Sequence, residues 1–334
     1  MMTLDEAVKK VRPLDEKAME GARKRWDSIA KPLHSLGELE NMLTQIAGIT
    51  GTPEVRVEKK AVVAMCADNG VVEEGVTQTG QEVTAVVAEN FLEGTTTCCV
   101  MCRQCGAELF PVDVGMVTDT KVRTDLKVAY GTRNMTREPA MTRGQAIRGI
   151  EAGIAMAEEL KEKGYQVLAT GEMGIGNTTT SSAVAAVLLG KPVEDMTGRG
   201  AGLTSEGLVR KINAIKKAIA LNNPDRSDAI DVLAKVGGLD IAGMAGVFIG
   251  AALIAVKICP QVSDHIIASH VSKEPAAQLL LKELGKEAII HAGMCLGEGT
   301  GAVALFPMMD LSCAVYNSMS TFGDINVEQY EELK

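Results

Sequence analysis

The stretch that decides the fold is QVLATGEMGIGNTTTSSAVAAVLLG, residues 166–190. Its first five residues, Gln166–Thr170, are a short apolar run that predicts a buried strand, and residues 177–190 predict a helix. A glycine-rich turn lies between the two. A strand, a glycine-rich turn and a helix in this order are typical of a mainly parallel sheet that helices cover on both faces. Because ligands of such a sheet bind beyond the carboxyl ends of its strands, the turn is a candidate functional site.

The same alternation extends along the chain in both directions. Further strands are predicted at 61–67, 108–114, 264–268 and 288–292, and further helices at 81–105, 142–163, 204–221, 239–258, 275–285 and 300–319. Before residue 51 the pattern is helical, with a capping box at Thr3–Glu6 and apolar stripes at 15–30 and after Ser35. We therefore predict a Rossmann-like α/β domain over 51–310 and a smaller helical domain over 1–50, completed by 311–334.

Composition and charge exclude several classes of protein. The chain has 334 residues, a net charge of −9, one Trp, four Tyr and five Phe. It therefore lacks the positive charge and the stacking surfaces of a nucleic-acid binder. Its first residues are charged where a signal peptide would be apolar, and the longest uncharged apolar stretch, 241–256, is too short to cross a bilayer as a helix. We predict a soluble, cytoplasmic protein without nucleic-acid or membrane partners.

Glycine-rich loops follow three of the predicted strands, at 67–84, 170–180 and 296–301. In the second loop, Asn177–Thr180 adds amide and hydroxyl donors at a helix start, which favours phosphate binding. Two loops also place a carboxylate among glycines, Glu172 and Glu298. Such a carboxylate either points into a cleft, where burial raises its pKa and suits it to general-base catalysis, or only adds negative charge near a helix N-terminus. We favour the catalytic interpretation for Glu298 and leave both open for Glu172.

Four of the eight cysteines cluster at Cys98, Cys99, Cys102 and Cys105. Their spacing resembles part of an iron–sulfur motif, but the run lacks a clear fourth ligand and a closing Cys-Pro. The same spacing places the thiols along one helix face, where free Cys packs as a small hydrophobe, and we favour this second interpretation. No metal site is predicted from the four histidines, because none has a second His four residues further on.

At the glycine-rich loops the sequence resembles the nicotinate-nucleotide:dimethylbenzimidazole phosphoribosyltransferase family, which makes the lower-ligand nucleotide of cobamides. The resemblance extends in family order from residue 31 to about residue 322. The matching segments lie within Lys31–Glu40, Ala67–Gly70, Gln81–Thr84, Asp113–Gly115, Gly131–Asn134, Gly171–Thr179, Gly198–Gly200, Gly237–Gly243, Ser269–His270 and Gly297–Gly301. The set as a whole is specific, although no single motif is.

The resemblance implies a reaction and roles for individual residues. Nicotinate mononucleotide and an aromatic base give an α-ribazole-type 5′-phosphate and free nicotinate, without a cofactor or a metal, in a homodimer. Glu298 is the implied general base, and Glu172 is a second active-site carboxylate. The implied phosphate and ribose contacts are Gly174, Gly176, Asn177, Thr178, Gly200, Lys211 and Ser272, and the implied base pocket contains Thr79, Gly80, Gln81 and Leu296.

This sequence departs from the family pattern at three places. Leu33–His34 stands where the family usually has Pro-Gly, Asn69 where it usually has His, and Thr79–Gly80 where it often has Tyr-Pro. The last change replaces an aromatic wall of the expected base pocket by small residues, which predicts that bulkier benzimidazoles or phenolic compounds are accepted. The alternatives are a relative that binds a base or nucleotide without catalysis, against which both glutamates argue, and an iron–sulfur redox protein.

Overall fold

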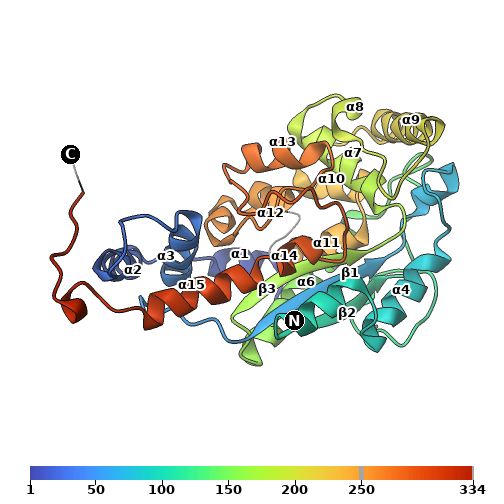
Figure 1. Cartoon of the computed structure of the whole chain (residues 1–334). Helices are drawn as coiled ribbons and strands as arrows, with labels where there is room; N and C mark the ends of the chain where they lie inside the picture. The colour runs from blue at the N-terminus through green and yellow to red at the C-terminus, as the bar shows by residue number, and fades with distance from the viewer. Residues whose placement is uncertain (248–251, 333–334) are drawn as a thin grey trace.

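The central strand β1 (Lys60–Ala67) is buried at every residue in the computed structural model, which describes residues 1–247 and 252–332. It pairs in parallel with β2 (Ala107–Gly115) on one side and with β3 (Val167–Met173) on the other (Figure 1). Helices surround this sheet. The predicted α/β class, a parallel sheet flanked by helices, is thus confirmed.

The described helices connect and cover these strands. They are α1 (Leu4–Lys10), α2 (Glu16–Ser28), α3 (Glu38–Thr50), α4 (Glu82–Glu93), α5 (Thr97–Gln104), α6 (Arg143–Glu162), α7 (Asn177–Leu189), α8 (Val193–Met196), α9 (Ser205–Asn222), α10 (Ala229–Val236), α11 (Leu239–Val247), α12 (Ala252–Ile258), α13 (Ala276–Glu283), α14 (Thr300–Val303) and α15 (Phe306–Ser318), with short 3₁₀ turns at Gly70–Glu74, Pro260–His265 and Gly323–Ile325.

Alternate residues of β1 belong to two different apolar layers, because successive side chains of a strand point to opposite faces. Val63 and Met65 pack in the larger cluster together with residues of α6 and α11. Val62 lies on the other face with α5 and α14, and Cys66 lies there with α4. Since helices cover both faces, the strand is a continuous apolar run rather than an alternating one.

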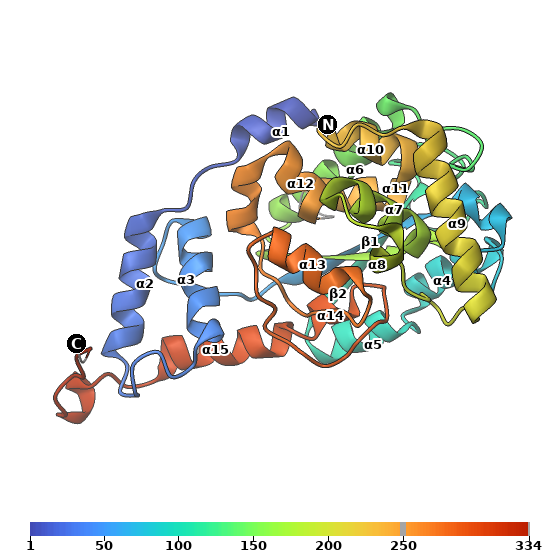
Figure 2. The same ribbon diagram turned by 90° about the horizontal axis from the view of Figure 1, so that it is seen from above.

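A separate apolar cluster holds a smaller helical unit beside the sheet. Helices α2, α3 and α15 pack around Trp26 and Tyr316, whose ring centroids are 4.9 Å apart (Figure 2). Helix α1 instead packs on α6: Leu4 joins the larger core, and its backbone N–H donates to Glu151 at 3.2 Å. The three N-terminal helices are confirmed, including the capping box at Thr3. The domain boundaries stay a prediction.

Two of the predicted strands are wrong. Residues 264–268 and 288–292 are mainly irregular, and the chain joins these regions in a single bridge between His270 and Ile290, which is not part of the sheet. Both segments are apolar for another reason, since Ile267, Ile289 and Ile290 pack against the smaller helical unit. The described part of the sheet therefore has three strands.

Two predicted helices are divided, and a third is described only in part. The helix predicted at 81–105 ends at Gly94, whose φ of +72° provides a left-handed C-cap. It restarts after Thr96, whose hydroxyl accepts from the Cys99 N–H. The helix predicted at 300–319 is divided between α14 and α15. Of the helix predicted at 239–258, residues 248–251 lie outside the described part, and α11 and α12 occupy the rest.

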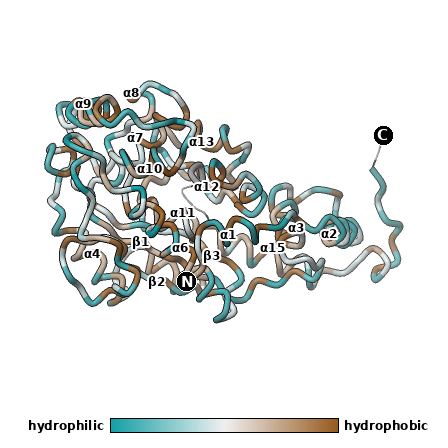
Figure 3. Tube along the Cα trace, turned by 180° about the vertical axis from the view of Figure 1, so that it is seen from behind, coloured by the Kyte–Doolittle hydropathy of each residue, from teal (hydrophilic) through white to brown (hydrophobic). Residues whose placement is uncertain are grey.

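The chain after α15 first pairs with the end of α2, where Ile29 and Thr321 form an antiparallel bridge. Beyond this bridge it extends outward from the helical unit, and its tube shows both hydrophilic and hydrophobic residues (Figure 3). Within residues 1–247 and 252–332, no helix combines the length and the apolar character that crossing a membrane requires.

Candidate active site

The carboxyl ends of the three strands meet at one edge of the sheet. The parallel register places Cys66 of β1 beside Met173 of β3, and Ala67 beside Gly115 of β2. Asp68 and the following loop leave β1 at this edge, and the Gly174–Gly176 turn leaves β3 there. The candidate site lies where these loops meet, as expected for a parallel sheet.

The turn after β3 brings the start of α7 close to this edge. Gly176 has a φ of +93°, a left-handed conformation that L side chains rarely adopt, and it is the N-cap of α7 without a side chain to cover the helix end. Gly174 packs against the Ala67 carbonyl of β1. No side chain therefore caps the start of this thirteen-residue helix at the site, and a helix N-terminus of this kind favours phosphate binding.

A buried lysine lies beside this helix start. Lys211 of α9 is fully buried, and its Nζ donates to the Thr178 hydroxyl at 2.8 Å and to the Gly198 carbonyl at 3.2 Å. Burial lowers the pKa of Lys211 to about 8, which the negative charge of Glu274 partly opposes. A Cβ on Gly200 would lie 2.8 Å from the Thr178 hydroxyl. Thr178, Gly200 and Lys211, predicted separately as phosphate contacts, are thus together.

Ser272 is connected to this group through Glu274. The Ser272 hydroxyl accepts from the Glu274 N–H at 3.3 Å, and the Glu274 carboxylate lies against Gly198. Ser272 therefore lies near Lys211 and is connected to it indirectly, through Glu274.

Glu172 lies in β3, one residue before the strand ends, and its environment disfavours the charge. Burial, and then the negative charge of Asp240, raise the pKa of Glu172 to about 7, although the Asn177 side-chain amide donates to it. Asn177 is the first residue of α7. The two predicted site residues Glu172 and Asn177 are therefore in direct contact, and the carboxyl group titrates in the physiological range.

Glu298 lies on the facing loop in a left-handed conformation, with a φ of +63°. Its backbone carbonyl packs against Gly171, where any side chain would collide with it. Its carboxylate accepts the Cys98 N–H at 3.0 Å, in the first turn of α5. Backbone strain of this kind persists only where surrounding structure holds it, and it is common at functional sites.

A cavity of about 230 Å³ opens between these loops. Glu172, Leu296, Gly297 and Thr300 line it, together with residues that the sequence analysis did not select, above all Met244 and His270. Burial lowers the pKa of the half-buried His270. The sequence signal for His270 is the Ser269–His270 segment, which is one of the segments that resemble the family.

The three remaining predicted base-side residues lie on a different loop and do not line this cavity. The Gln81 side-chain amide donates to the Asn69 carbonyl at 3.2 Å. Gln78 donates to the Gly202 carbonyl, which anchors the segment of Thr79 and Gly80 beside the loop that contains Gly200. Gln81 thus contacts the loop after β1, whereas Leu296 lines the cavity beside Glu172.

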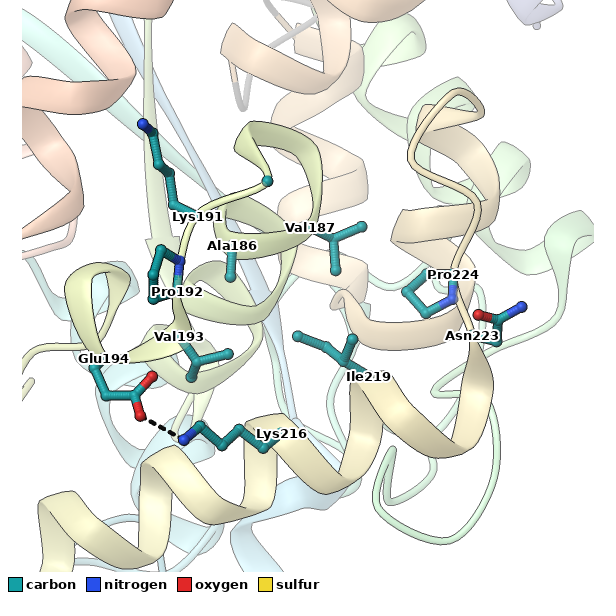
Figure 4. Close-up of a pocket in the computed structure, with 11 residues that line it drawn as sticks. Ala186, Val187, Lys191, Pro192, Val193, Glu194, Lys216, Ile219, Asn223 and Pro224 are labelled. Atoms are coloured by element: carbon teal, nitrogen blue, oxygen red, sulfur yellow. Dashed lines mark hydrogen bonds and ion pairs between the residues drawn. The ribbon is translucent and has the colours of Figure 1, made fainter.

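A second cavity, of about 380 Å³, lies between α7, α8 and α9 (Figure 4). Its walls are mainly aliphatic, and Lys216 pairs with Glu194 at its rim. None of the predicted site residues is among the eleven that line it. It is therefore distinct from the candidate active site.

Comparison with known proteins decides the family. A family model described as phosphoribosyltransferase matches residues 11–327. The nicotinate-nucleotide–dimethylbenzimidazole phosphoribosyltransferase of Ruminiclostridium cellulolyticum is 46% identical over 352 residues, with 100% of both chains covered, and the one of Clostridium acetobutylicum has the same identity and coverage. The chain belongs to the nicotinate-nucleotide–dimethylbenzimidazole phosphoribosyltransferase family.

Solved structures agree with this membership of the nicotinate-nucleotide–dimethylbenzimidazole phosphoribosyltransferase family. The crystal structure of CobT from Thermus thermophilus matches with a TM-score of 0.88 and 35% identity, covering 94% of this chain and 100% of that chain. Because the fold matches over nearly the whole length, the resemblance predicted from the loops is confirmed.

The structure also shows how the cysteine cluster is packed. Cys98, Cys99 and Cys102 are buried in apolar clusters under α5, and the Sγ atoms of Cys98 and Cys102 are 3.9 Å apart. Over residues 1–247 and 252–332, no group of His, Cys, Asp or Glu side chains has the geometry to hold a metal ion. The packing interpretation accounts for the buried positions of these three cysteines.

Proposed function

We propose that this enzyme transfers the 5-phosphoribosyl group of nicotinate mononucleotide to an aromatic base of the benzimidazole class, for assembly of a cobamide lower ligand. The observation that carries the proposal is the pair of glutamates, one near the end of β3 and one on the loop that faces it. Glu172 lies against Gly297 of the loop that contains Glu298, and the Glu298 carbonyl lies against Gly171 of β3. The end of β3 and the Glu298 loop therefore enclose one site, next to a helix start suited to phosphate.

In the proposed reaction, a ring nitrogen of the base forms a bond to C1′ of the ribose. The C1′–N bond to nicotinate breaks, and its electron pair returns to the positively charged pyridinium nitrogen, which leaves as neutral nicotinate nitrogen. The second ring nitrogen of the base loses its proton to Glu298, which acts as general base. For a phenol, the attacking oxygen itself would lose the proton to Glu298. Lys211, Thr178 and the α7 N-terminus bind the 5′-phosphate.

Glu172 is proposed to stabilise the positive charge that develops on the ribose as the nicotinate leaves. Only the ionised carboxylate does this. Since the pKa of Glu172 is about 7, the carboxyl group is ionised above that pH and protonated below it.

We therefore expect kcat/KM to fall by about tenfold between its plateau and pH ~6, where one site in about ten stays ionised. Glu172→Gln should have a lower plateau and should lose this acid limb. The substrate phosphate titrates near pH ~6 as well, but both enzymes share that titration, so the difference between their pH profiles isolates Glu172. An acid limb that is unchanged in Glu172→Gln would remove this role.

The proposed function is tested by chromatographic measurement of nicotinate released from nicotinate mononucleotide, with and without dimethylbenzimidazole and without added metal. We expect release that depends on the base, together with an equal amount of ribazole-type nucleotide. Absence of release with every base, despite binding of the nucleotide in a titration, would instead indicate a protein that binds without catalysis.

The base specificity is the second part of the proposal. Thr79 is exposed, and a Cβ on Gly80 would meet only the flexible end of the Glu82 side chain, so this loop has room for larger ligands. In competition assays we expect bulkier benzimidazoles or phenols such as p-cresol to be used at least as well as dimethylbenzimidazole. Thr79→Tyr should shift the ranking back toward dimethylbenzimidazole. A wild-type preference for dimethylbenzimidazole over the whole panel would contradict this part.

We further propose a cytoplasmic homodimer with two domains, 1–50 with 311–334 and 51–310. The separate apolar cluster of α2, α3 and α15 supports the division. Sedimentation analysis of the purified chain tests the dimer.

A further inference from the structure

Asn69 occupies the point where three loops of the site come together. It lies just after β1, and its side chain is fully buried. Its Nδ2 donates to Asp240 Oδ2 at 3.4 Å, its Oδ1 accepts from the Thr180 hydroxyl at 3.3 Å, and its carbonyl accepts from Gln81 at 3.2 Å. One residue thus links the loop after β1, the first turn of α7 and the start of α11.

Three glycines also lie close to the Asn69 side chain. A Cβ on Gly174 would lie 3.1 Å from Asn69 Nδ2, one on Gly176 would lie 3.3 Å from the Asn69 Cβ, and one on Gly238 would lie 2.6 Å from Asn69 Oδ1. Other atoms lie closer still: the Ala67 carbonyl at Gly174, the Val72 side chain at Gly176 and the Asp240 carboxylate at Gly238. Asn69 is therefore one of several groups that leave no room for a larger residue at these positions.

We propose that Asn69 is a positioning residue that holds the phosphate side of the active site, Gly174–Thr180, in fixed alignment with Gln81 and the base-side loop. The inference rests on the proposed function and adds a residue to it. Asn69 acts through its neighbours, because its polar atoms are occupied by Asp240, Thr180 and Gln81. The amide is suited to this position because it donates to a carboxylate and accepts from a hydroxyl at the same time.

The charges around Asn69 make the amide hard to replace. Asp240 is fully buried, and burial raises its pKa to about 6. The ionisable groups that interact electrostatically with the Asp240 carboxylate are Asp68 and Cys66 on the β1 side and Glu172 on β3. None of these is a cation. An ionised Asp240 therefore depends on neutral donors such as the Asn69 amide and the Ile241 N–H at 2.9 Å.

The test compares Asn69→Asp and Asn69→Ala with the wild type, measuring kcat and both KM values from about pH 5.5 to about pH 8.5. Asn69→Asp places two carboxylates in contact, which repel each other at high pH and share a proton at low pH. We expect its kcat/KM to be at least about tenfold below wild type at pH ~8 and to recover, relative to wild type, at pH ~5.5. Asn69→Ala should be impaired at both values by a similar factor, mainly through KM for the nucleotide.

A pH profile of Asn69→Asp that parallels the wild type, or wild-type constants in Asn69→Ala, would overturn the proposal. If Asn69→Asp does not fold, Thr180→Val removes the hydroxyl bond to Asn69 together with the bond to the Asn177 carbonyl within α7, and an unchanged KM in that variant would count equally against the proposal. Asn326→Asp, at an exposed position of the tail, is the matched control. If the wild type releases no nicotinate, the proposed function fails, whereas pH-dependent loss of nucleotide binding in Asn69→Asp by calorimetry would still support the positioning role.

Discussion

Glu298→Gln is expected to lower kcat for base-dependent nicotinate release by about 10²–10⁴-fold, the usual contribution of a positioned general base. The amide has the same shape as the carboxyl group but cannot take the proton from the base. The substitution should leave the loop in place, because the Gln side-chain oxygen still accepts from the Cys98 N–H, to which Glu298 bonds at 3.0 Å. The KM for nicotinate mononucleotide should therefore change little.

Rapid-quench or steady-state assays with saturating base measure this effect. Glu162→Gln is the matched control, because Glu162 is an exposed residue at the end of α6, before β3 begins, and so lies toward the opposite edge of the sheet. Its kinetics should match wild type. A Glu298→Gln enzyme within about threefold of wild type would mean that the proton goes elsewhere. The next candidate would then be Glu172, whose pKa of about 7 suits a base.

The elements of the fold that sequence predicted best are those whose apolar pattern had a single structural explanation. The strand at 61–67 is covered by helices on both faces, so continuous apolar character identified it correctly. Residues 288–292 have a similar pattern, yet Ile289 and Ile290 are apolar because they pack against α3 and α15 in the helical unit. An apolar run indicates burial without indicating its partner, and this ambiguity produced two strands too many.

The site was predicted in part for a related reason. Glu172, Asn177 and Thr178 lie in one motif, and Lys211 was implied by the family resemblance. The structure joins Glu172 to Asn177 and Thr178 to Lys211. The contact between Asn69 and Asp240, however, joins residues that are 171 positions apart. Neither residue has a local pattern that reveals the other. Only the close approach of the loops at the sheet edge creates the cluster that raises the pKa of Glu172 and of Asp240.

Lys211→Met is expected to raise the KM for nicotinate mononucleotide by about 10- to 150-fold, with a smaller effect on kcat. Hydrogen bonds to charged groups contribute about 1.5–3 kcal/mol, and about 1.4 kcal/mol is a factor of ten in affinity. Methionine fills the space of a fully buried lysine without its charge. Lys217→Met, at an exposed position of the same helix, is the control and should bind the nucleotide as wild type does.

The pKa of Lys211 gives this prediction a second, independent test. Because burial lowers that pKa to about 8, the ammonium group is charged below that pH and becomes neutral above it. Wild-type kcat/KM should therefore fall by about tenfold between its plateau and pH ~9, whereas Lys211→Met should be low and flat over this range. Together with the acid limb from Glu172, the wild type should show a narrow optimum between about pH 7 and about pH 8. If the basic limb persists in Lys211→Met, another group causes it, and Lys211 has a role in packing alone.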